Sequence, residues 1–501
     1  MDNKSLQLYN SYTRTKETFD PITPGHVGLY VCGPTVSGES HLGHARPYIT
    51  FDVVNRYLQH LGYKVRYVRN ITDAGHFEEE GREAQDKVSE KAVLEKLEPM
   101  ELVQKYTNLF HWGMAQFNCL PPSIEPTATG HIIEQISMIQ EIMKKGYAYE
   151  VNGSVYFDVG KYAKNYPYGK LSGRIPEDLL STTRTLEGQD EKRNTADFAL
   201  WKKAPEKHLM RWQSPWGEGF PGWHIECSAM SSKYLGQTFD IHGGGMDLQF
   251  PHHESEIAQS TIAHGHAPAK YWMHNNMITI NGKKMGKSYN NVIKLTELFS
   301  GNHPILEQAY HPMVIRFYIL QTHYRSTLDF SNEALQASER ALKRIWEAYE
   351  ILKTLPEPDE NSGTDMELNE KIETHCKACA ADMNDDFNTA KVLADLFELV
   401  PVINGLREGQ IKTNALSVEN FRLLQETFGL YLEEILGLQS PTENYNSDLL
   451  DRVMQVIIDL RKDARSKKDY ALSDAIRDKL AAAGIQLKDG KDGSIRFQIG
   501  N

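Results

Sequence analysis

The sequence has few cysteines, no long apolar run and no excess of positive charge. The five cysteines are scattered along 501 residues, which favours reduced thiols in the cytosol over a disulfide framework. The amino terminus, MDNKSLQLYN, has no signal-peptide core, and no apolar run approaches transmembrane length. The formal net charge of −12 excludes a general basic coat for nucleic acid, although a local patch suffices to bind one. We expect a cytoplasmic protein without a membrane span, divided into about two to four domains.

The stretch Cys32 to His44, CGPTVSGESHLGH, joins a predicted strand to a predicted helix. Val27 to Val31 is a short apolar run, and Ala45 to Leu61 carries apolar residues at helical spacing. A glycine-bearing turn between a first strand and a helix is where nucleotide phosphates bind, on the unpaired N–H groups of the helix. His41 and His44 are three residues apart and share one face of the first turn. The pattern is compatible with a nucleotide site, but by itself ordinary helix-cap histidines are the commoner explanation of so short a motif.

The next apolar run predicts the fold class. Val65 to Val68 is a second short strand, and with the first strand and its helix it makes a βαβ unit, hence a parallel sheet. We therefore expect an α/β protein with a Rossmann-type parallel-sheet domain, an inserted connective segment, a helical domain and a small C-terminal domain. The predicted ranges are 1–118 and 222–303 for the two halves of the sheet domain, 119–221 for the insertion, 304–355 for a helical region, 366–438 for a helical bundle and 448–501 for the C-terminal domain.

Further local predictions follow from pattern and turn residues. Tyr147 to Asp158 is a hairpin around the turn pair Asn152-Gly153, and 160–222 is irregular. In the second half we expect a helix over Trp223 to Leu235, a strand over Thr238 to Ile241, a ligand-approaching turn over His242 to Gly245, a helix over His252 to His264, a strand over Tyr271 to Ile280, and an almost wholly helical region from Pro304 to Leu355.

A polar loop after the last predicted strand carries two lysines. Lys284 and Lys287 lie three residues apart in KMGKS, with Gly282 and Gly286 beside them. Such a loop can bring positive charge to a leaving pyrophosphate. By itself the motif is more typical of a solvated loop.

Two cysteines, a histidine and a carboxylate suggest a metal. Cys32 ends the first strand, Cys227 lies in WHIECSAM, and His252 and Glu256 lie in HHESE. Spacing i, i+4 places His252 and Glu256 on one helical face, and this donor set favours zinc. From spacing alone His253 fits with Glu256 equally well, and buried free cysteines with a helix cap remain an alternative.

These motifs together carry a resemblance that covers essentially the whole chain. HLGH resembles the HIGH signature of class I aminoacyl-tRNA synthetases, and KMGKS resembles their KMSKS signature, with Gly286 in place of serine. The combined pattern is similar to the cysteinyl-tRNA synthetase family. The resemblance implies ATP-dependent activation of L-cysteine to cysteinyl-adenylate and transfer to the 3′ end of tRNA(Cys). It also implies a monomer, Mg²⁺ with ATP, and one zinc ion that selects the substrate thiolate, without an editing domain.

The resemblance also assigns roles to single positions. The implied zinc ligands are Cys32, Cys227, His252 and Glu256; the catalytic residues are His41, His44, Lys284 and Lys287; the ATP-binding residues are Gly43, Gly244, Asp247 and Lys287; the cysteine-binding residues are Tyr30, Thr72, Trp223 and His242. Asp247 would contact the ribose, and a helix N-cap is the alternative reading of that residue.

The C-terminal part resembles the same family. The segment 383–389, MNDDFNT, is similar to the family's helical domain, and 448–501 to its anticodon-binding domain. Between Arg452 and Arg496 there are eleven Lys or Arg residues against seven Asp, which suits phosphate binding or a solvated helix face. Arg465, Tyr470 and Asp474 match the anticodon-reading positions; the family often has Trp where Tyr470 stands, and either ring can stack on a base.

Two other enzyme and binding classes compete with this interpretation. A shorter relative, the mycothiol-pathway ligase, joins activated cysteine to an amino sugar without tRNA, and the segment 366–501 argues against it. A catalytically silent RNA-binding paralogue is disfavoured by the intact HLGH and both loop lysines. The CxxC pair Cys376 and Cys379 lies in a helical pattern without a second pair, so we expect no metal there, and Cys119 is expected to be structural.

Overall fold

The computed structural model describes residues 6–74, 92, 97–174, 191–206, 208–286, 289–359, 362–467, 469–482, 485–489 and 495–499. The chain divides into two compact units, residues 1–439 and 440–501, each of which is described by itself. None of the helices in the described part of the chain combines the length and the apolar character that crossing a membrane requires.

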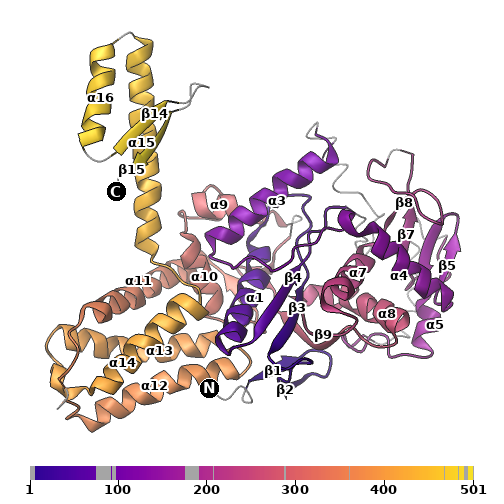
Figure 1. Ribbon diagram of the computed structural model, residues 1–501, viewed down its shortest axis with the longest axis horizontal. Coiled ribbons are helices and arrows are strands. Elements are labelled where there is room, and N and C mark those ends of the chain that lie inside the picture. Colours follow the sequence, from indigo (N-terminus) through magenta and orange to yellow (C-terminus); the bar gives the residue numbers. More distant parts are fainter. Residues whose placement is uncertain are drawn as a thin grey trace. The chain divides into compact units, whose positions relative to one another are not determined.

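A four-stranded parallel sheet lies at the centre of the first unit, with the order β10-β9-β3-β4 (Figure 1). Its strands are β3 (His26–Val31), β4 (Lys64–Arg69), β9 (Phe239–Gly245) and β10 (Ala269–Asn275). The helix α1 (Leu42–His60) connects β3 to β4, which confirms the predicted βαβ unit. Side chains alternate along β3, so Leu29 and Val31 join the core cluster that includes α1, while Tyr30 joins a cluster with residues of α7 (Trp223–Leu235). The sheet is covered on both faces, as parallel sheets require.

The insertion is more regular than the sequence predicts. Its sheet has the order β5-β6-β7-β8, all antiparallel, formed by β5 (Ala148–Val151), β6 (Ser154–Phe157), β7 (Phe198–Lys203) and β8 (Gly219–Pro221). The hairpin is confirmed, because Asn152 and Gly153 have the positive φ angles, 52° and 86°, of a type I′ turn. The prediction that 160–222 is irregular was wrong for β7 and β8. The four residues that begin β7 are all buried, so no polar alternation marks that strand.

The second half of the sheet domain begins with α7, whose bounds are those predicted, and includes α8 (His252–His264). The predicted turn over His242 to Gly245 was wrong, because β9 continues to Gly245 and pairs with β10 throughout. The predicted strand 271–280 is two strands, β10 and β11 (Ile278–Ile280). Asn281 and Gly282 form the next turn, again with positive φ, into β12 (Lys283–Lys284).

One strand interrupts the region that was predicted to be helical from Pro304. This strand, β13 (Leu328–Phe330), pairs in parallel with β11 and lies between α10 (Pro312–Leu320) and α11 (Asn332–Thr354). Its three residues are too few to show a period of two in the sequence. The helices that follow form the predicted bundle: α12 (Met366–Asn384), α13 (Thr389–Arg407), α14 (Val418–Gly429) and the π-helix η6 (Leu430–Ile435).

A buried arginine joins the sheet domain to the end of this bundle. Arg316 of α10 has no exposed surface and donates from Nη2 to Asp52 Oδ2 of α1 at 2.5 Å. It also donates to the main-chain oxygens of Leu436 (2.6 Å) and Phe117 (2.7 Å). Arg56 donates to the same Asp52 oxygen at 2.8 Å. One side chain therefore fixes α1, α10 and the residues that follow η6.

The remaining elements complete the first unit or belong to the second. In the first unit they are β1 (Gln7–Asn10), β2 (Thr15–Thr18), α3 (Pro99–Gln116), η2 (Thr129–His131), α4 (Ile132–Lys144), α5 (Val159–Ala163), η3 (Met246–Gln249), α9 (Leu295–Ser300) and η5 (Thr413–Ala415). The second unit consists of α15 (Pro441–Ser466), α16 (Tyr470–Ala482) and an antiparallel pair, β14 (Ile485–Asp489) and β15 (Ile495–Ile499). Both α15 and β14 pack against α16.

Candidate active site and metal centre

Metal-ligand side chains gather at the carboxyl edge of the parallel sheet, in two overlapping buried groups. One group is Cys32, Cys227, His252 and Glu256, and the other is Cys32, His242, His253 and Glu256. In each group the candidate ligand atoms all lie within 4.8 Å of one another. The first group is the set predicted from the sequence. The second brings in His253, which spacing left open, and His242, which was predicted to bind cysteine.

Three elements bring these side chains together. Cys32 follows β3, Cys227 lies on α7, and the i, i+4 pair His252 and Glu256 lies on α8. The Cys32 and Cys227 sulfurs are 4.0 Å apart, and His252 Nε2 is 3.1 Å from Glu256 Oε1. Cys32 thus reaches across from the sheet to residues about 200 positions later in the chain.

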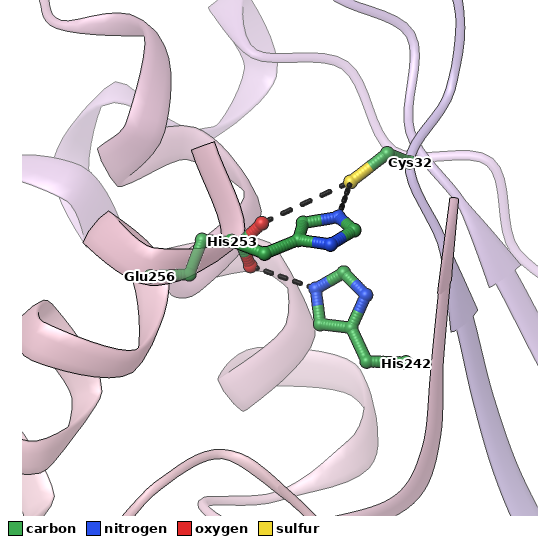
Figure 2. A group of neighbouring side chains, drawn as sticks. All are labelled: Cys32, His242, His253 and Glu256. Carbon is green, nitrogen blue, oxygen red and sulfur yellow. Dashed lines mark hydrogen bonds and ion pairs between the residues drawn. The ribbon is translucent and has the colours of Figure 1, made fainter. Parts of the chain in front are cut away.

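Figure 2 shows the second group, with Cys32 and His242 pointing from the sheet toward α8. Cys32 Sγ lies 3.2 Å from His253 Nε2 and 3.8 Å from Glu256 Oε1, while His242 Nε2 lies 2.9 Å from Glu256 Oε2. The carboxylate of Glu256 therefore serves both groups, with one oxygen toward His252 and the other toward His242.

The electrostatics of the first group favour charged donors. Burial acts to raise the pKa of Cys227, but a hydrogen bond with Cys32 and the charge of His252 lower it to about 6. Burial acts to lower the pKa of His252, yet Cys227 and Glu256 raise it to about 10. Burial likewise opposes ionisation of Glu256, but His242 and His252 lower its pKa to about 2. A thiolate and a carboxylate are thus present at neutral pH. Burial and Cys227 raise the pKa of Cys32 well above its ordinary value, so Cys32 and His252 would each release a proton on binding a metal.

His253 differs from its neighbour. Burial and the nearby histidines His242 and His274 hold its pKa well below the ordinary value. Its Nδ1 lies 2.7 Å from His274 Nε2, and His274 Nδ1 lies 2.9 Å from Ser11 Oγ. His252 has a comparable partner, because its Nδ1 lies 3.0 Å from His224 Nδ1. Second partners of this kind orient histidines that bind metals.

The residues predicted to bind cysteine surround this cluster. Tyr30 and His242 are register partners on β3 and β9, and their ring centroids are 5.2 Å apart. The Trp223 ring lies 4.5 Å from that of His252. Thr72 is buried and donates from its hydroxyl to Glu226 Oε1 at 2.6 Å. The structure therefore brings all four side chains to one place.

Sequence reasoning missed Glu226. Glu226 directly precedes Cys227 on α7, and burial raises the pKa of its carboxyl well above the ordinary value. Asn70 begins the polar segment Asn70 to Asp73 that follows β4, at the edge where open α/β sheets bind ligands, and its Oδ1 lies 3.7 Å from Cys227 Sγ. The position of Glu226 next to Cys227 in WHIECSAM was the only signal that could have identified it.

The two signature segments, HLGH and KMGKS, contact each other. His41 is the N-cap of α1, and its main-chain N–H donates to His44 Nδ1 at 3.2 Å. The two rings stack with centroids 3.8 Å apart. Burial and the neighbouring His41 lower the pKa of His44 to about 3, so His44 is a neutral imidazole whose proton is on Nε2.

Main-chain hydrogen bonds hold the lysine segment against HLGH. Leu42 N–H donates to Ile293 at 3.0 Å, and Leu295 N–H donates to Ser40 at 2.9 Å. The terminal methyl of Met285 lies 2.7 Å from where a Cβ of Gly43 would stand, so only glycine fits there without displacement.

Lys284 and the remaining residues predicted to bind ATP lie in three different elements of the structure or outside its described part. Lys284 is exposed and lies in β12, while Lys287 lies outside the described residues. Gly244 belongs to β9, and a Cβ there would stand 2.9 Å from His253. Asp247 is exposed in η3, and Gly245, not Asp247, occupies the N-cap position of that helix. The cap alternative for Asp247 is therefore wrong.

In the second unit, the positions predicted to read the anticodon lie near the turn between its two helices. Tyr470 begins α16 and is 59% exposed. Asp474 is exposed one turn later and pairs with Arg477 at 3.3 Å. Arg465 is exposed near the end of α15. Their role stays a prediction.

Comparisons with known proteins agree with this arrangement. Residues 18–340 match the family model of the class I (C) tRNA synthetase catalytic domain, and residues 379–438 match the DALR domain. A cysteine–tRNA ligase of Bacteroides thetaiotaomicron is 57% identical over 494 residues, covering 97% of this chain and 98% of the relative. One of Phocaeicola vulgatus is 56% identical, covering 98% and 99%.

The chain belongs to the cysteine–tRNA ligase family of class I aminoacyl-tRNA synthetases. Its fold is also that of a solved Mycobacterium tuberculosis methionyl-tRNA synthetase in complex with methionyl-adenylate, with a TM-score of 0.55 at 12% identity over 82% of this chain and 89% of that chain. Membership of the cysteine–tRNA ligase family confirms two predictions, the α/β fold class and the aminoacyl-tRNA synthetase class of enzyme.

Proposed function

We propose that the protein activates L-cysteine with ATP and transfers it to the 3′ end of tRNA(Cys). The observation that supports this most directly is the buried cluster of two cysteines, a histidine and a glutamate, one of whose cysteines, Cys32, begins the stretch of chain that ends in HLGH at the start of α1. The cluster offers ligands for a thiol-selecting metal, and the adjacent helix N-terminus offers N–H groups for phosphates. The family of relatives points to the same substrate pair.

We assign the zinc ligands to Cys32, Cys227, His252 and Glu256. This group has two sulfur donors, which zinc favours, whereas the group with His242 and His253 has one. The cation would supply a binding site for a thiolate that a hydroxyl cannot match, which separates cysteine from serine beyond the roughly hundredfold of an ordinary pocket. Tyr30, Thr72, Trp223 and His242 enclose the remainder of the amino acid.

Charge stabilisation and positioning account for the ATP step. The Nε2–H of neutral His44 and the His41 ring lie at the start of α1, where a phosphate would bind. Lys284, with Lys287, supplies positive charge for the departing pyrophosphate. Gly43, Gly244 and Asp247 form the edge for the nucleoside, and Mg²⁺ accompanies ATP.

The transfer step needs no protein nucleophile. A terminal ribose hydroxyl of the tRNA attacks the acyl carbon of the adenylate, the new ester bond forms, and AMP leaves with the bonding electrons of the mixed anhydride. In the second unit, Arg465, Tyr470 and Asp474 would contact the anticodon. We propose a monomer located in the cytoplasm, in keeping with five free cysteines.

The decisive experiment combines aminoacylation with metal analysis. The protein should charge bulk tRNA with labelled cysteine when ATP is present, ignore serine, and contain about one zinc per chain. Cys227→Ser should lose the metal and the rejection of serine. The matched control is Cys376→Ser, a buried cysteine of α12 far from the cluster in sequence, which should keep both. Cysteine-dependent pyrophosphate exchange without charging would favour the amino-sugar ligase instead, and unchanged zinc in Cys227→Ser would refute the ligand assignment.

The two histidines can be separated in the same assay. His252→Asn should lose zinc if the sulfur-rich group binds it, while His253→Asn should retain zinc. The reverse result would assign the metal to Cys32, His242, His253 and Glu256.

A further inference from the structure

The turn that joins α12 to α13 has an unusual main chain. Asp386 and Phe387 are successive non-glycine residues with positive φ angles, 67° and 53°. The left-handed region is unfavourable for residues with a side chain, and for a bulky ring most of all, so contacts with the rest of the protein must hold the turn. Asp386 is fully buried, and its carboxylate makes several of these contacts.

The Asp386 carboxylate binds two parts of the chain that are far from the helical bundle in sequence. Oδ1 accepts from the main-chain N–H of Tyr9 in β1 at 2.8 Å and from the Tyr324 hydroxyl at 2.7 Å. Oδ2 accepts from Arg325 Nε at 2.7 Å. Tyr324 and Arg325 belong to the loop 321–327, which connects α10 to β13. One buried carboxylate therefore fixes this loop to the bundle through two of its side chains.

The main chain of the same loop is held by Arg46, which lies two residues after HLGH on α1. Arg46 is 1% exposed, and its Nη1 donates to the main-chain oxygen of Met277 at 2.6 Å. Its Nη2 contacts three main-chain oxygens of the loop, those of His323 and Tyr324 at 3.4 Å and that of Ser326. Because these partners are main-chain atoms, the path of the loop determines where the Arg46 guanidinium lies, and with it the first turns of α1.

The loop also fixes the part of the chain that leads to KMGKS. The main-chain N–H of Asn276 donates to the main-chain oxygen of Tyr324 at 2.8 Å, and Asn276 Nδ2 donates to that of Arg325 at 2.9 Å. Two residues after Asn276 the strand β11 begins, and its partner β12 carries Lys284. The loop 321–327 therefore connects Asp386 of the bundle to both signature segments.

We propose that Asp386 is a positioning residue for the ATP step. The inference rests on the proposed function, in which HLGH and the loop lysines stabilise the departing pyrophosphate. A small displacement of such groups lowers the rate of the step that they stabilise. The candidate zinc ligands instead follow β3 or lie on α7 and α8, so a change confined to the loop should alter the ATP step and spare the binding of cysteine.

Asp386→Asn tests the inference with little change in shape. The amide keeps one oxygen for Tyr9 and Tyr324 and places an NH₂ group against Arg325 Nε, so that two donors face each other. With the zinc-loaded full chain, kcat and KM for ATP are measured by cysteine-dependent pyrophosphate exchange, and cysteine affinity without ATP is measured by calorimetry. We expect kcat to fall about tenfold and the cysteine affinity to change by less than about twofold.

The matched control is Asp385→Asn. Asp385 directly precedes Asp386, but its side chain is 42% exposed and pairs with Lys16 and Lys391. Because exposed pairs contribute little, this change should leave both quantities within about twofold of the unmodified protein. Tyr324→Phe removes only the hydroxyl that donates to Asp386 and should lower kcat about threefold, so it provides the test if Asp386→Asn does not fold.

A double variant tests whether the effect passes through the loop. Arg46→Lys leaves one ammonium group in place of the two guanidinium nitrogens and should lower kcat by itself. Since Asp386 and Arg46 hold one loop, Asp386→Asn should lower kcat by less than about twofold more when Arg46→Lys is already present. A further loss of the full tenfold would show two independent effects and would overturn the connection.

The outcomes separate this inference from the proposed function. A lower melting temperature of Asp386→Asn with unchanged kcat would make Asp386 purely structural and overturn the inference, as would an equal loss of kcat and of cysteine affinity. An unmodified, zinc-loaded protein without cysteine-dependent pyrophosphate exchange would overturn the proposed function, and the inference with it.

Discussion

Arg316→Met would test the buried connection between the sheet domain and the helical bundle. The methionine fills part of the volume but donates nothing, so the main-chain oxygens of Leu436 and Phe117 lose their donor. Asp52 keeps its hydrogen bond from Arg56 but loses the guanidinium of Arg316, whose Nη2 lies 2.5 Å from Asp52 Oδ2. Removing one partner of a buried pair costs about 3–5 kcal/mol, and each stranded acceptor adds to that loss without simple additivity. We expect the free energy of unfolding of the first unit to fall by about 4 kcal/mol.

The loss is measurable by thermal unfolding followed through tryptophan fluorescence. With about 2.1 cal/mol/K of unfolding entropy per residue, a unit spanning residues 1–439 should lose about 4 °C in its midpoint. The control is Arg422→Met, which breaks an exposed pair with Glu357 and should shift the midpoint by less than about 1 °C. A shift for Arg316→Met no larger than that of the control would show that Arg56 alone satisfies Asp52, and would refute the reasoning.

Three further predictions concern the other parts of the molecule. Tyr470→Ala should lower kcat/KM for tRNA about 10- to 100-fold and leave pyrophosphate exchange unchanged, while Tyr470→Phe keeps both; equal loss in the two assays would rule out a stacking role. Gly33→Ala should cost about 3 kcal/mol in urea unfolding, because its Cβ would overlap the main-chain oxygen of Asn70; an unchanged midpoint would contradict this. Burial and Asp395 raise the pKa of Asp382 from 3.8 to about 6, so the folded state holds this proton more tightly than the unfolded state. Wild-type stability therefore falls as pH rises through that window, and Asp382→Asn should gain in melting temperature relative to the wild type between pH 4 and 7; a constant difference would refute the assignment.

The metal cluster shows how much of the candidate site could be predicted from the sequence. Residue type identified Cys32 and Cys227 as candidates, and helical spacing identified the acidic partner on α8. Spacing could not choose between His252 and His253, because both lie within one turn of Glu256. The fold shows why that choice is hard. Glu256 presents one oxygen to His252 of the first group and the other to His242 of the second, and His253 lies against Cys32, so both groups have all four ligand atoms close together.

The misplaced turn in β9 has a different cause. Three consecutive glycines are typical of a turn, because glycine has no side chain that favours a strand. Pairing with β10 overrides that preference, since Gly243 to Gly245 stand opposite Met273 to Asn275 in one ladder. The neighbouring sequence gives no sign of why Gly243 is required. In the fold, a Cβ at this position would overlap the ring of Phe51 in α1. Tertiary packing, not turn formation, explains this glycine.

The environment of Glu226 could not be predicted from its sequence position. A glutamate in the first turn of a helix is common, because it interacts favourably with the helix dipole. Its distinguishing property is a buried oxygen, Oε2, without a hydrogen-bond partner among the residues that the structure describes, while Oε1 accepts from Thr72. This property depends on contacts between segments that are distant in the sequence.

The main-chain hydrogen bonds between the HLGH segment and the segment that follows the two lysines bear on how Lys284 can move. Asn291 accepts from Gly286 N–H at 2.8 Å and donates to the main-chain oxygen of Lys284 at 3.1 Å, on the same side of the site as the Leu42–Ile293 and Ser40–Leu295 bonds. With the main chain of Lys284 held in this way, its ammonium group reaches or leaves a phosphate by rotation about side-chain bonds. Such rotations take picoseconds to nanoseconds, whereas hinge motions of domains take microseconds to milliseconds. Under the proposed function, release of pyrophosphate then requires no movement of the main chain that carries Lys284, and the hydrogen bonds between the HLGH segment and residues 293–295 stay in place during that step.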